Sequence, residues 1–209
     1  MRVQPDVTSP ALNAAYATPG PPAEAAPEAL VRAARDGEVR AFELLVTRYH
    51  PRALRFALNM GLVREDAEEV VQDAFVRVYR ALPRFRDGAA FEPWLFRILA
   101  NRCRSAHARS RVWRRAAGDD AAIALLPAPG PGTSGAADAE TLRGAVLKAL
   151  ETLPREQREA FLLRHVEDLD YDDMMRITGA GLSALKMRVK RACDALRLRL
   201  TEDFGARRD

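Results

Sequence analysis

The sequence has little of what metal centres, disulfide scaffolds and membrane spans require. Its 209 residues include 2 cysteines and 3 histidines, whose spacing fits neither a disulfide framework nor a metal cluster. No Gly-rich phosphate loop is visible, and the longest apolar stretch, around residues 121–127, is too short to span a bilayer. The N-terminus lacks the basic start and apolar run of a signal peptide. These absences predict a soluble, cytoplasmic protein that is not inserted in a membrane, is not an enzyme, and has no cofactor, metal or small-molecule substrate.

Proline, glycine and charge are unevenly distributed along the chain. Residues 1–27 hold many prolines among alanines and have too little large apolar surface to order a backbone, which predicts a disordered tail. Residues 116–140 are rich in proline and glycine, and all their charges are acidic, which predicts a flexible linker. Apolar residues recur at helical spacing in 28–115 and 141–200, before a short tail at 201–209. We therefore expect an all-α fold of two small helical domains.

The segment Phe91–Arg115 combines an apolar helical stripe with a cationic face. Glu92 followed by Pro93 indicates a helix start. The stripe consists of Trp94, Leu95, Ile98, Leu99, Cys103 and Ala106. The arginines are Arg102, Arg104, Arg109, Arg111, Arg114 and Arg115, and no acidic residue lies among them. We expect this charge to lack a partner within the protein, which indicates an external polyanion. For the segment alone, a solvated basic surface is an equally good interpretation.

Earlier helices are predicted from Glu28, after Gly37 and at 64–82. In the second of these, Pro51 can open a continuation that ends near Gly61. In the third, Asp66 and Glu69 resemble a capping pair, and the acidic residues precede the arginines. Complementarity to the helix dipole explains that order of signs without excluding a protein partner on the acidic half.

The loop at residues 83–91 places Phe85 and Phe91 between arginines. Aromatic rings in a basic loop can stack on an unpaired base, at about 1–3 kcal/mol each. They can equally fill the core of their own domain. The sequence favours the core for Phe91 and leaves Phe85 open.

The second domain has the helix-turn-helix pattern. A helix opened by Pro154, with Phe161, Leu162 and Val166 inside, precedes a short helix at 169–178, a turn at 179–181 and a longer basic helix at 182–200. The residues expected inside the last helix are Leu182, Leu185, Val189, Ala192 and Leu196. Those expected outside are Ser183, Lys186, Met187, Lys190 and Arg191. This outer face would suit a major groove. A bundle helix with a solvated basic face is the weaker alternative, because turn, helix lengths and charge agree.

The two halves together resemble the extracytoplasmic-function (ECF) sigma factors of bacterial RNA polymerase, which retain only sigma regions 2 and 4. The resemblance lies in AFELLVTRYHPRALRFA (41–57), DAEEVVQDAFVRVYRALPRF (66–85), FEPWLFRILANRCRSAHARSR (91–111) and ALETLPREQREAFLLRHVEDLDYDDMMRITGAGLSALKMRVKRACDAL (149–196). It implies a region 2 domain at 28–115, a linker at 116–140 and a region 4 domain at 141–200. Its specificity comes from the order and joint presence of these segments.

The resemblance implies three binding surfaces and no catalytic activity. Core RNA polymerase would bind Asp66, Glu69, Gln72 and Asp73. The opened minus-ten element of promoter DNA would bind Phe85, Phe91, Trp94, Asn101, Arg102 and Arg104. The minus-thirty-five duplex would bind Arg155, Arg158, Ser183, Lys186, Met187, Lys190 and Arg191. An anti-sigma factor that covers these surfaces is a further implied partner.

The sequence departs from the family at a few positions. Ser105 stands where an aspartate is frequent, SALKMR (183–188) replaces the usual opening of the recognition helix, and Met174-Met175 replaces Ile-Ala. These changes affect the expected promoter sequence and leave the architecture unchanged.

Two other functions fit parts of the chain. A stand-alone helix-turn-helix activator or repressor would need only the last domain, and such proteins usually dimerise. A protein-binding helical scaffold fits the helices but leaves both arginine-rich faces unexplained.

Overall fold

The computed structural model describes residues 26–86, 88–117 and 146–205. The predicted tail at 1–27 and linker at 116–140 lie outside these residues except at their edges, since the first helix begins at Pro27 and another reaches Ala117. The helices before the linker are α2 (Pro27–Arg35), α3 (Val39–Asn59), α4 (Arg64–Ala81), the 3-10 turn η1 (Leu82–Arg84) and α5 (Phe91–Ala117). Those after it are α7 (Arg155–Phe161), the π-helical turn η2 (Leu162–Val166), α8 (Tyr171–Thr178) and α9 (Leu182–Gly205). The described residues are thus helices and turns, as the sequence predicts.

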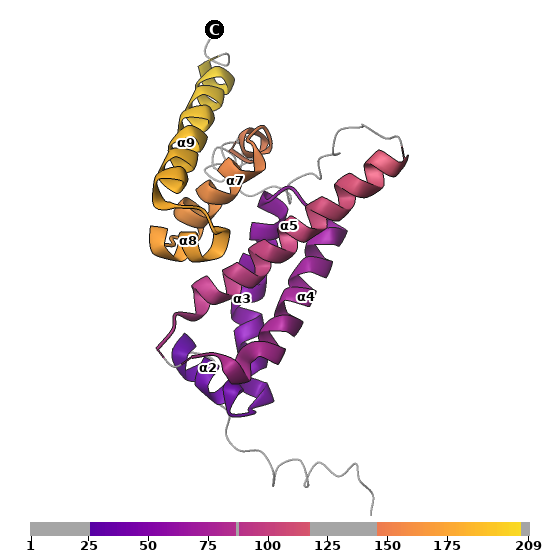
Figure 1. Ribbon diagram of the computed structural model, residues 1–209, viewed down its shortest axis with the longest axis vertical. Helices are drawn as coiled ribbons and strands as arrows, with labels where there is room; N and C mark the ends of the chain where they lie inside the picture. The colour runs from indigo at the N-terminus through magenta and orange to yellow at the C-terminus, as the bar shows by residue number, and fades with distance from the viewer. Residues whose placement is uncertain (1–25, 87, 118–145, 206–209) are drawn as a thin grey trace, which may run out of the picture.

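The first helical unit, α2 to α5, closes around one apolar core. α4 packs against α5, and α3 packs against α2 and α4 (Figure 1). Fully buried side chains from three helices meet there, among them Leu45, Phe56, Val71 and Leu99. Phe56 and Phe96 form an edge-to-face pair with ring centroids 5.3 Å apart. This core fixes the outer faces of α4 and α5 relative to each other.

Pro51 lies inside one continuous helix, because Tyr49 and Ala53 on either side of it face the same core and hold both halves in line. The capping pair expected at the start of α4 is wrong. α4 begins at Arg64 and its N-cap, Val63, makes no side-chain hydrogen bond, so Asp66 does not cap the helix. Asp66 instead lies in the first turn, where the dipole favours negative charge.

The second unit contains the helix-turn-helix. Asp170 caps α8 by accepting a hydrogen bond from the backbone N–H of Asp173 at 2.7 Å. α8 ends at Gly179, whose φ of 73° favours a residue without a side chain. The turn at 179–181 then leads into α9, which continues past the predicted end at residue 200 to Gly205.

Side-chain directions in this unit differ from expectation at two positions. Val166 was expected inside but is 44% exposed. The π-helical turn places both Leu162 and Leu163 against the core, and the residues that follow it are therefore shifted outward. Leu182 is 40% exposed because it is the first residue of α9, before the helix reaches the core at Leu185. The other residues expected inside α9 are buried.

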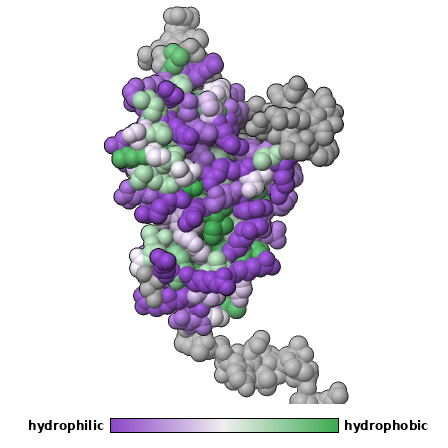
Figure 2. All heavy atoms as spheres, viewed as in Figure 1, coloured by the Kyte–Doolittle hydropathy of each residue, from purple (hydrophilic) through white to green (hydrophobic). Residues whose placement is uncertain are grey.

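The two units lie against each other. α5 of the first packs along α8 of the second, and α9 runs on the far side of the second unit from α5 (Figure 1). The surface in view is mostly hydrophilic, with only scattered apolar residues (Figure 2). The helix-turn-helix and the arginine-rich helix are therefore in direct contact.

Candidate nucleic-acid interface

The outer face of α9 carries the residues predicted to read duplex DNA. Leu185, Val189, Ala192 and Leu196 are buried, so the alternate positions Ser183, Lys186, Met187, Lys190 and Arg191 are exposed. The Nζ atom of Lys186 lies 5.9 Å from the ring centroid of Tyr171, at the start of α8. Arg188 donates a 2.6 Å hydrogen bond to Glu156 and ties α9 to α7. The structure brings this predicted group together on one cationic face.

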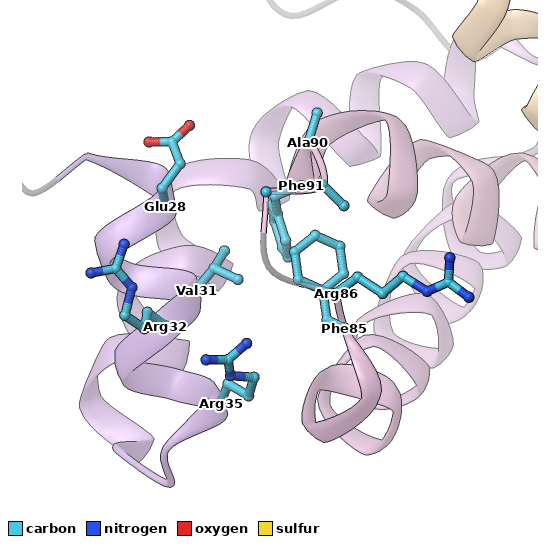
Figure 3. A pocket seen from close by; sticks show the side chains of 10 residues that line it. Glu28, Val31, Arg32, Arg35, Phe85, Arg86, Ala90 and Phe91 are labelled. Atoms are coloured by element: carbon cyan, nitrogen blue, oxygen red, sulfur yellow. The ribbon is translucent and has the colours of Figure 1, made fainter.

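A cavity of about 260 Å³ opens between α2 and the loop after η1 (Figure 3). Phe85 and Phe91 form part of its wall, and Arg32, Arg35 and Arg86 supply positive charge around it. Figure 3 shows the ring of Phe85 beside that of Phe91 on the loop side. The arrangement joins aromatic rings with positive charge, as an unpaired nucleotide requires.

The rings around this cavity divide between the core and the surface. Phe91 is 5% exposed and packs on Tyr49 with centroids 5.3 Å apart, which agrees with the interpretation that it fills the core. Phe85 is half-buried and lies 4.7 Å from the ring of Trp94. Trp94 is also half-buried, so Phe85 and Trp94 are the two rings able to offer a face to a base. Their contacts with DNA stay predictions.

The expectation that the arginines of α5 lack internal partners is wrong for Arg102, Arg104 and Arg109, while the side chains of Arg111, Arg114 and Arg115 lie outside the described residues. Arg102 pairs with Asp73 at 2.5 Å, Arg109 lies 3.5 Å from Glu69, and Arg104 pairs with Glu159. Each acidic partner comes from another helix, far away in the sequence, which is why the local charge count missed it. The positive charge of α5 is therefore partly neutralised within the protein.

The acidic residues predicted to bind polymerase lie along one side of α4. Glu69 and Gln72 are exposed, and Asp66 and Asp73 are half-buried. Partial burial acts to raise the pKa of Asp73, but the hydrogen bond from Arg77 and the charge of Arg102 outweigh it, and the pKa is lowered. Asp73 therefore stays ionised at neutral pH, and its pair with Arg102 connects the predicted polymerase surface with the predicted minus-ten surface.

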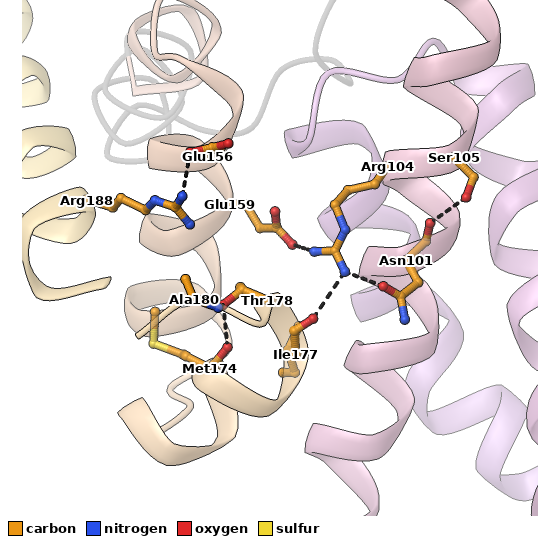
Figure 4. A network of polar contacts seen from close by, with 10 residues as sticks. All are labelled: Asn101, Arg104, Ser105, Glu156, Glu159, Met174, Ile177, Thr178, Ala180 and Arg188. Atoms are coloured by element: carbon orange, nitrogen blue, oxygen red, sulfur yellow. Dashed lines mark hydrogen bonds and ion pairs between the residues drawn. The ribbon is translucent and has the colours of Figure 1, made fainter. Parts of the chain in front are cut away.

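Two further predicted DNA contacts, Arg104 and Arg158, lie between the two units, while Asn101 is exposed on α5. Arg104 donates to Asn101, to Glu159 and, at 3.1 Å, to the carbonyl of Ile177 (Figure 4). Arg158 donates to the carbonyl of Met60 at 3.1 Å. Asn101 is thus engaged through its side-chain oxygen. The structure separates these residues from the exposed face of α9, while Arg155, at the start of α7, is half-buried.

Sequence reasoning missed two acidic residues and one arginine at this contact. Glu159 and Glu167 are 5% and 2% exposed, and Arg52 binds Glu167 with an Nε–Oε2 distance of 2.5 Å. The one available signal was the spacing of Glu159, which precedes Leu162 and Leu163 by three and four residues and so shares their buried side. Nothing local marked Arg52.

Known proteins match the chain across both helical units. Residues 45–114 match the family described as Sigma-70 region 2, and residues 143–196 match Sigma-70, region 4. The ECF RNA polymerase sigma-E factor of Escherichia coli K12 is 30% identical over 179 residues, which cover 81% of this chain and 91% of that protein. The RNA polymerase sigma-H factor of Pseudomonas aeruginosa is 29% identical over 178 residues, which cover 80% and 90%.

Solved structures show the same architecture. CnrH, solved in complex with the cytosolic domain of CnrY, is 27% identical with a TM-score of 0.63, and the match covers 86% of this chain and 99% of CnrH. The sigma factor RpoE of Bartonella quintana, solved in complex with the anti-sigma factor NepR, is 26% identical with a TM-score of 0.62, and the match covers 78% of this chain and 98% of RpoE.

These matches define a transcription initiation factor built from Sigma-70 regions 2 and 4. The chain belongs to the ECF sigma factors of RNA polymerase, which direct promoter recognition and the start of transcription. The family prediction is confirmed, and a stand-alone helix-turn-helix regulator is not favoured, because the match includes both units. Among the described residues, no three His, Cys, Asp or Glu side chains are grouped as a metal ion would need. No described helix is long and apolar enough to cross a membrane.

Proposed function

We propose that this chain binds core RNA polymerase through α4, holds the opened minus-ten strand with α5 and the preceding loop, and reads the minus-thirty-five duplex with α9. It acts in the cytoplasm and has no catalytic activity of its own. The observation that carries the proposal is the outer face of α9, where five exposed side chains alternate with the buried Leu185, Val189, Ala192 and Leu196. α9 runs on the far side of the second unit from α5 (Figure 1).

The face of α9 combines side chains for phosphates and for base edges. Lys186, Lys190 and Arg191 supply positive charge for the backbone of the duplex. Ser183 lies in the first turn of α9, the part of a recognition helix that enters the groove, and Met187 offers apolar contact. Loss of one phosphate contact should weaken binding at all sequences, whereas loss of Ser183 or Met187 should change which sequence is preferred.

The cavity beside Phe85 supports a role in holding the opened strand. A base taken out of the duplex needs a stacking surface, and Phe85 and Trp94 provide tilted rings 4.7 Å apart. Arg32 and Arg86 at the same cavity suit the phosphates of that strand. The polar side chains of Asn101, Arg102 and Arg104 lie further along α5 and would contact the following nucleotides.

The acidic side of α4 supports docking on a basic surface of the polymerase. Asp66, Glu69 and Asp73 follow one another at intervals of three and four residues, and Gln72 comes three residues after Glu69, so they lie along one side of the helix. An anti-sigma factor is the further proposed partner, since the solved relative RpoE was captured in complex with one. Both partners would compete for exposed charged surfaces.

The proposed function is tested by transcription in vitro with core RNA polymerase and a library of randomised promoter DNA. We expect the wild-type chain to select a defined start site and promoter sequence. Lys186→Ala on α9 should weaken selection at the minus-thirty-five element and leave the minus-ten preference unchanged. Arg40→Ala is the matched control, because Arg40 is an exposed cation on α3 that pairs with Glu43 in the same helix. Absence of start-site selection by the folded wild-type chain would refute the proposal.

A further inference from the structure

The contact between the two helical units is built from oppositely charged side chains. The first unit contributes Arg104 from α5, whose guanidinium binds the carboxylate of Glu159 on α7 and the carbonyl of Ile177 on α8 (Figure 4). It also contributes Arg52 from α3, which binds both the carboxylate and, at 2.9 Å, the backbone carbonyl of Glu167. Arg52 and Arg104 thus bind Glu167 and Glu159 of the second unit, and both glutamates are almost completely buried.

A third arginine crosses the contact in the opposite direction. Arg158 of α7 donates to the carbonyl of Met60 at 3.1 Å and to the carbonyl of Glu151 at 2.6 Å. The ring of His107 on α5 lies 3.0 Å from the same carbonyl of Met60, so that one oxygen is shared by both units. Gly61, next to Met60, has a φ of 90° and leaves the space that the guanidinium of Arg158 occupies.

We propose that these three arginines and two glutamates form an autoinhibitory latch, which holds the free chain closed and withholds Arg104 from single-stranded DNA. The interdomain latch is defined as Arg52, Arg104, Arg158, Glu159 and Glu167. Its inhibitory effect depends on the proposed minus-ten role of Arg104. In the closed chain both terminal nitrogens of the Arg104 guanidinium donate hydrogen bonds, one to Glu159 and the other to Asn101 and the carbonyl of Ile177. A phosphate would have to compete with the Glu159 carboxylate for this guanidinium.

The latch is suited to release, because its ion pairs lie close to energetic balance. Desolvation of two buried carboxylates opposes the attraction of their arginines, and burial raises the pKa of both Glu159 and Glu167. The Oε1 atom of Glu167 is buried with no hydrogen-bond partner among the described residues. Polymerase and its promoter would therefore be able to separate the units without unfolding either.

The latch discriminates between the two forms of DNA. Ser183, Lys186, Met187, Lys190 and Arg191 are exposed on α9 in the closed chain, so the duplex-reading face stays free. Of the predicted DNA contacts, the latch engages Arg104, assigned to the single strand, and Arg158, assigned to the duplex. Opening the latch should therefore increase affinity for single-stranded DNA and change affinity for duplex DNA by a smaller factor, because the five contacts on α9 are already exposed.

The experiment compares two double variants of the full chain with equal net charge. Glu159→Gln with Glu167→Gln replaces the charged acceptors of the latch by neutral ones, which form weaker bonds to arginine. Glu43→Gln with Glu68→Gln is the control, because these exposed acids pair with Arg40 and Arg64 in their own helices. Small-angle X-ray scattering reports separation of the units. Fluorescence anisotropy with labelled 15-nucleotide DNA of randomised sequence measures the affinity of each variant for single-stranded and for duplex DNA.

We expect the latch variant to expand and to bind the single strand about tenfold more tightly, while its duplex affinity differs from that of the control by a smaller factor. A latch variant that keeps the dimensions of the control overturns the latch. Expansion with no gain in single-strand affinity also overturns the inhibition, and points to the proposed minus-ten role of Arg104 as the step that failed.

Discussion

Replacement of Gly61 by alanine provides a sharp test of the contact between the units. A Cβ atom built on Gly61 would collide with the Nη1 atom of Arg158, which donates to the neighbouring carbonyl of Met60. Gly37 offers the matched control, because its φ is 102° and a Cβ atom there meets nothing within 4 Å. Both substitutions impose a side chain on left-handed backbone, and only Gly61→Ala also displaces an arginine.

The expected magnitudes follow from these two effects. A left-handed backbone costs a residue with a side chain about 1–2 kcal/mol, which applies to both variants. Gly61→Ala should additionally lose the hydrogen bond from the Arg158 guanidinium to Met60, worth about 1.5–3 kcal/mol for a charged donor. We therefore expect Gly61→Ala to lower the free energy of unfolding by that further amount beyond Gly37→Ala.

Urea unfolding followed by circular dichroism measures both variants, each in the wild-type chain and in the Arg158→Ala background. Without the arginine there is nothing for the new methyl group to displace, so the two substitutions should then cost the same. A double-mutant cycle detects this because contacting residues couple by about 0.5–3 kcal/mol. A difference between the two variants that persists unchanged in the Arg158→Ala background would refute the described approach of Arg158 to Gly61.

Three other expectations concern single side chains. Burial raises the pKa of the Cys103 thiol to about 12, so at pH 8 iodoacetamide should label only the half-buried Cys193. Mass spectrometry should show that Cys193→Ser abolishes labelling of the folded chain. Rapid labelling of Cys103 at pH 8 would contradict its burial. Asp170→Ala should destabilise the protein by about 1 kcal/mol in urea unfolding through loss of the α8 cap, whereas Asp172→Ala, at an exposed position of the same helix, should have a smaller effect. Phe96→Ala should cost about 3–5 kcal/mol in the same assay because the ring is fully buried against Phe56, and a cost below 1 kcal/mol would contradict that packing.

Local patterns in the sequence predicted the helices and the faces that depend on one helix alone. The exposed side of α9 followed from the spacing of Leu185, Val189 and Ala192, because a helical period places residues on a side without reference to the rest of the chain. The end of α8 at Gly179 followed from turn chemistry for the same reason. The family resemblance then assigned functions to these faces, and the residue assignments stay predictions.

Local patterns could not predict features that depend on residues far apart in the sequence. The partners of Arg104 and Arg102 come from α7 and α4, so no window along α5 could reveal that its charge is partly neutralised. The cavity beside Phe85 needs α2, which lies some fifty residues earlier in the chain. Val166 was misplaced because regular helical spacing does not allow for a π-helical turn.

The π-helical turn at Leu162–Val166 makes the chain sensitive to its exact length at this point. A wide turn holds one residue more than a regular turn, and Glu167 follows it directly, with its backbone N–H bonded to the carbonyl of Leu162. Removal of a single residue here would restore ordinary α-helix and rotate everything downstream by about 100°. Glu167 would then turn away from Arg52, while the recognition helix kept its own fold. Loss of one codon would thus suffice to break the Arg52–Glu167 contact between the two helical units.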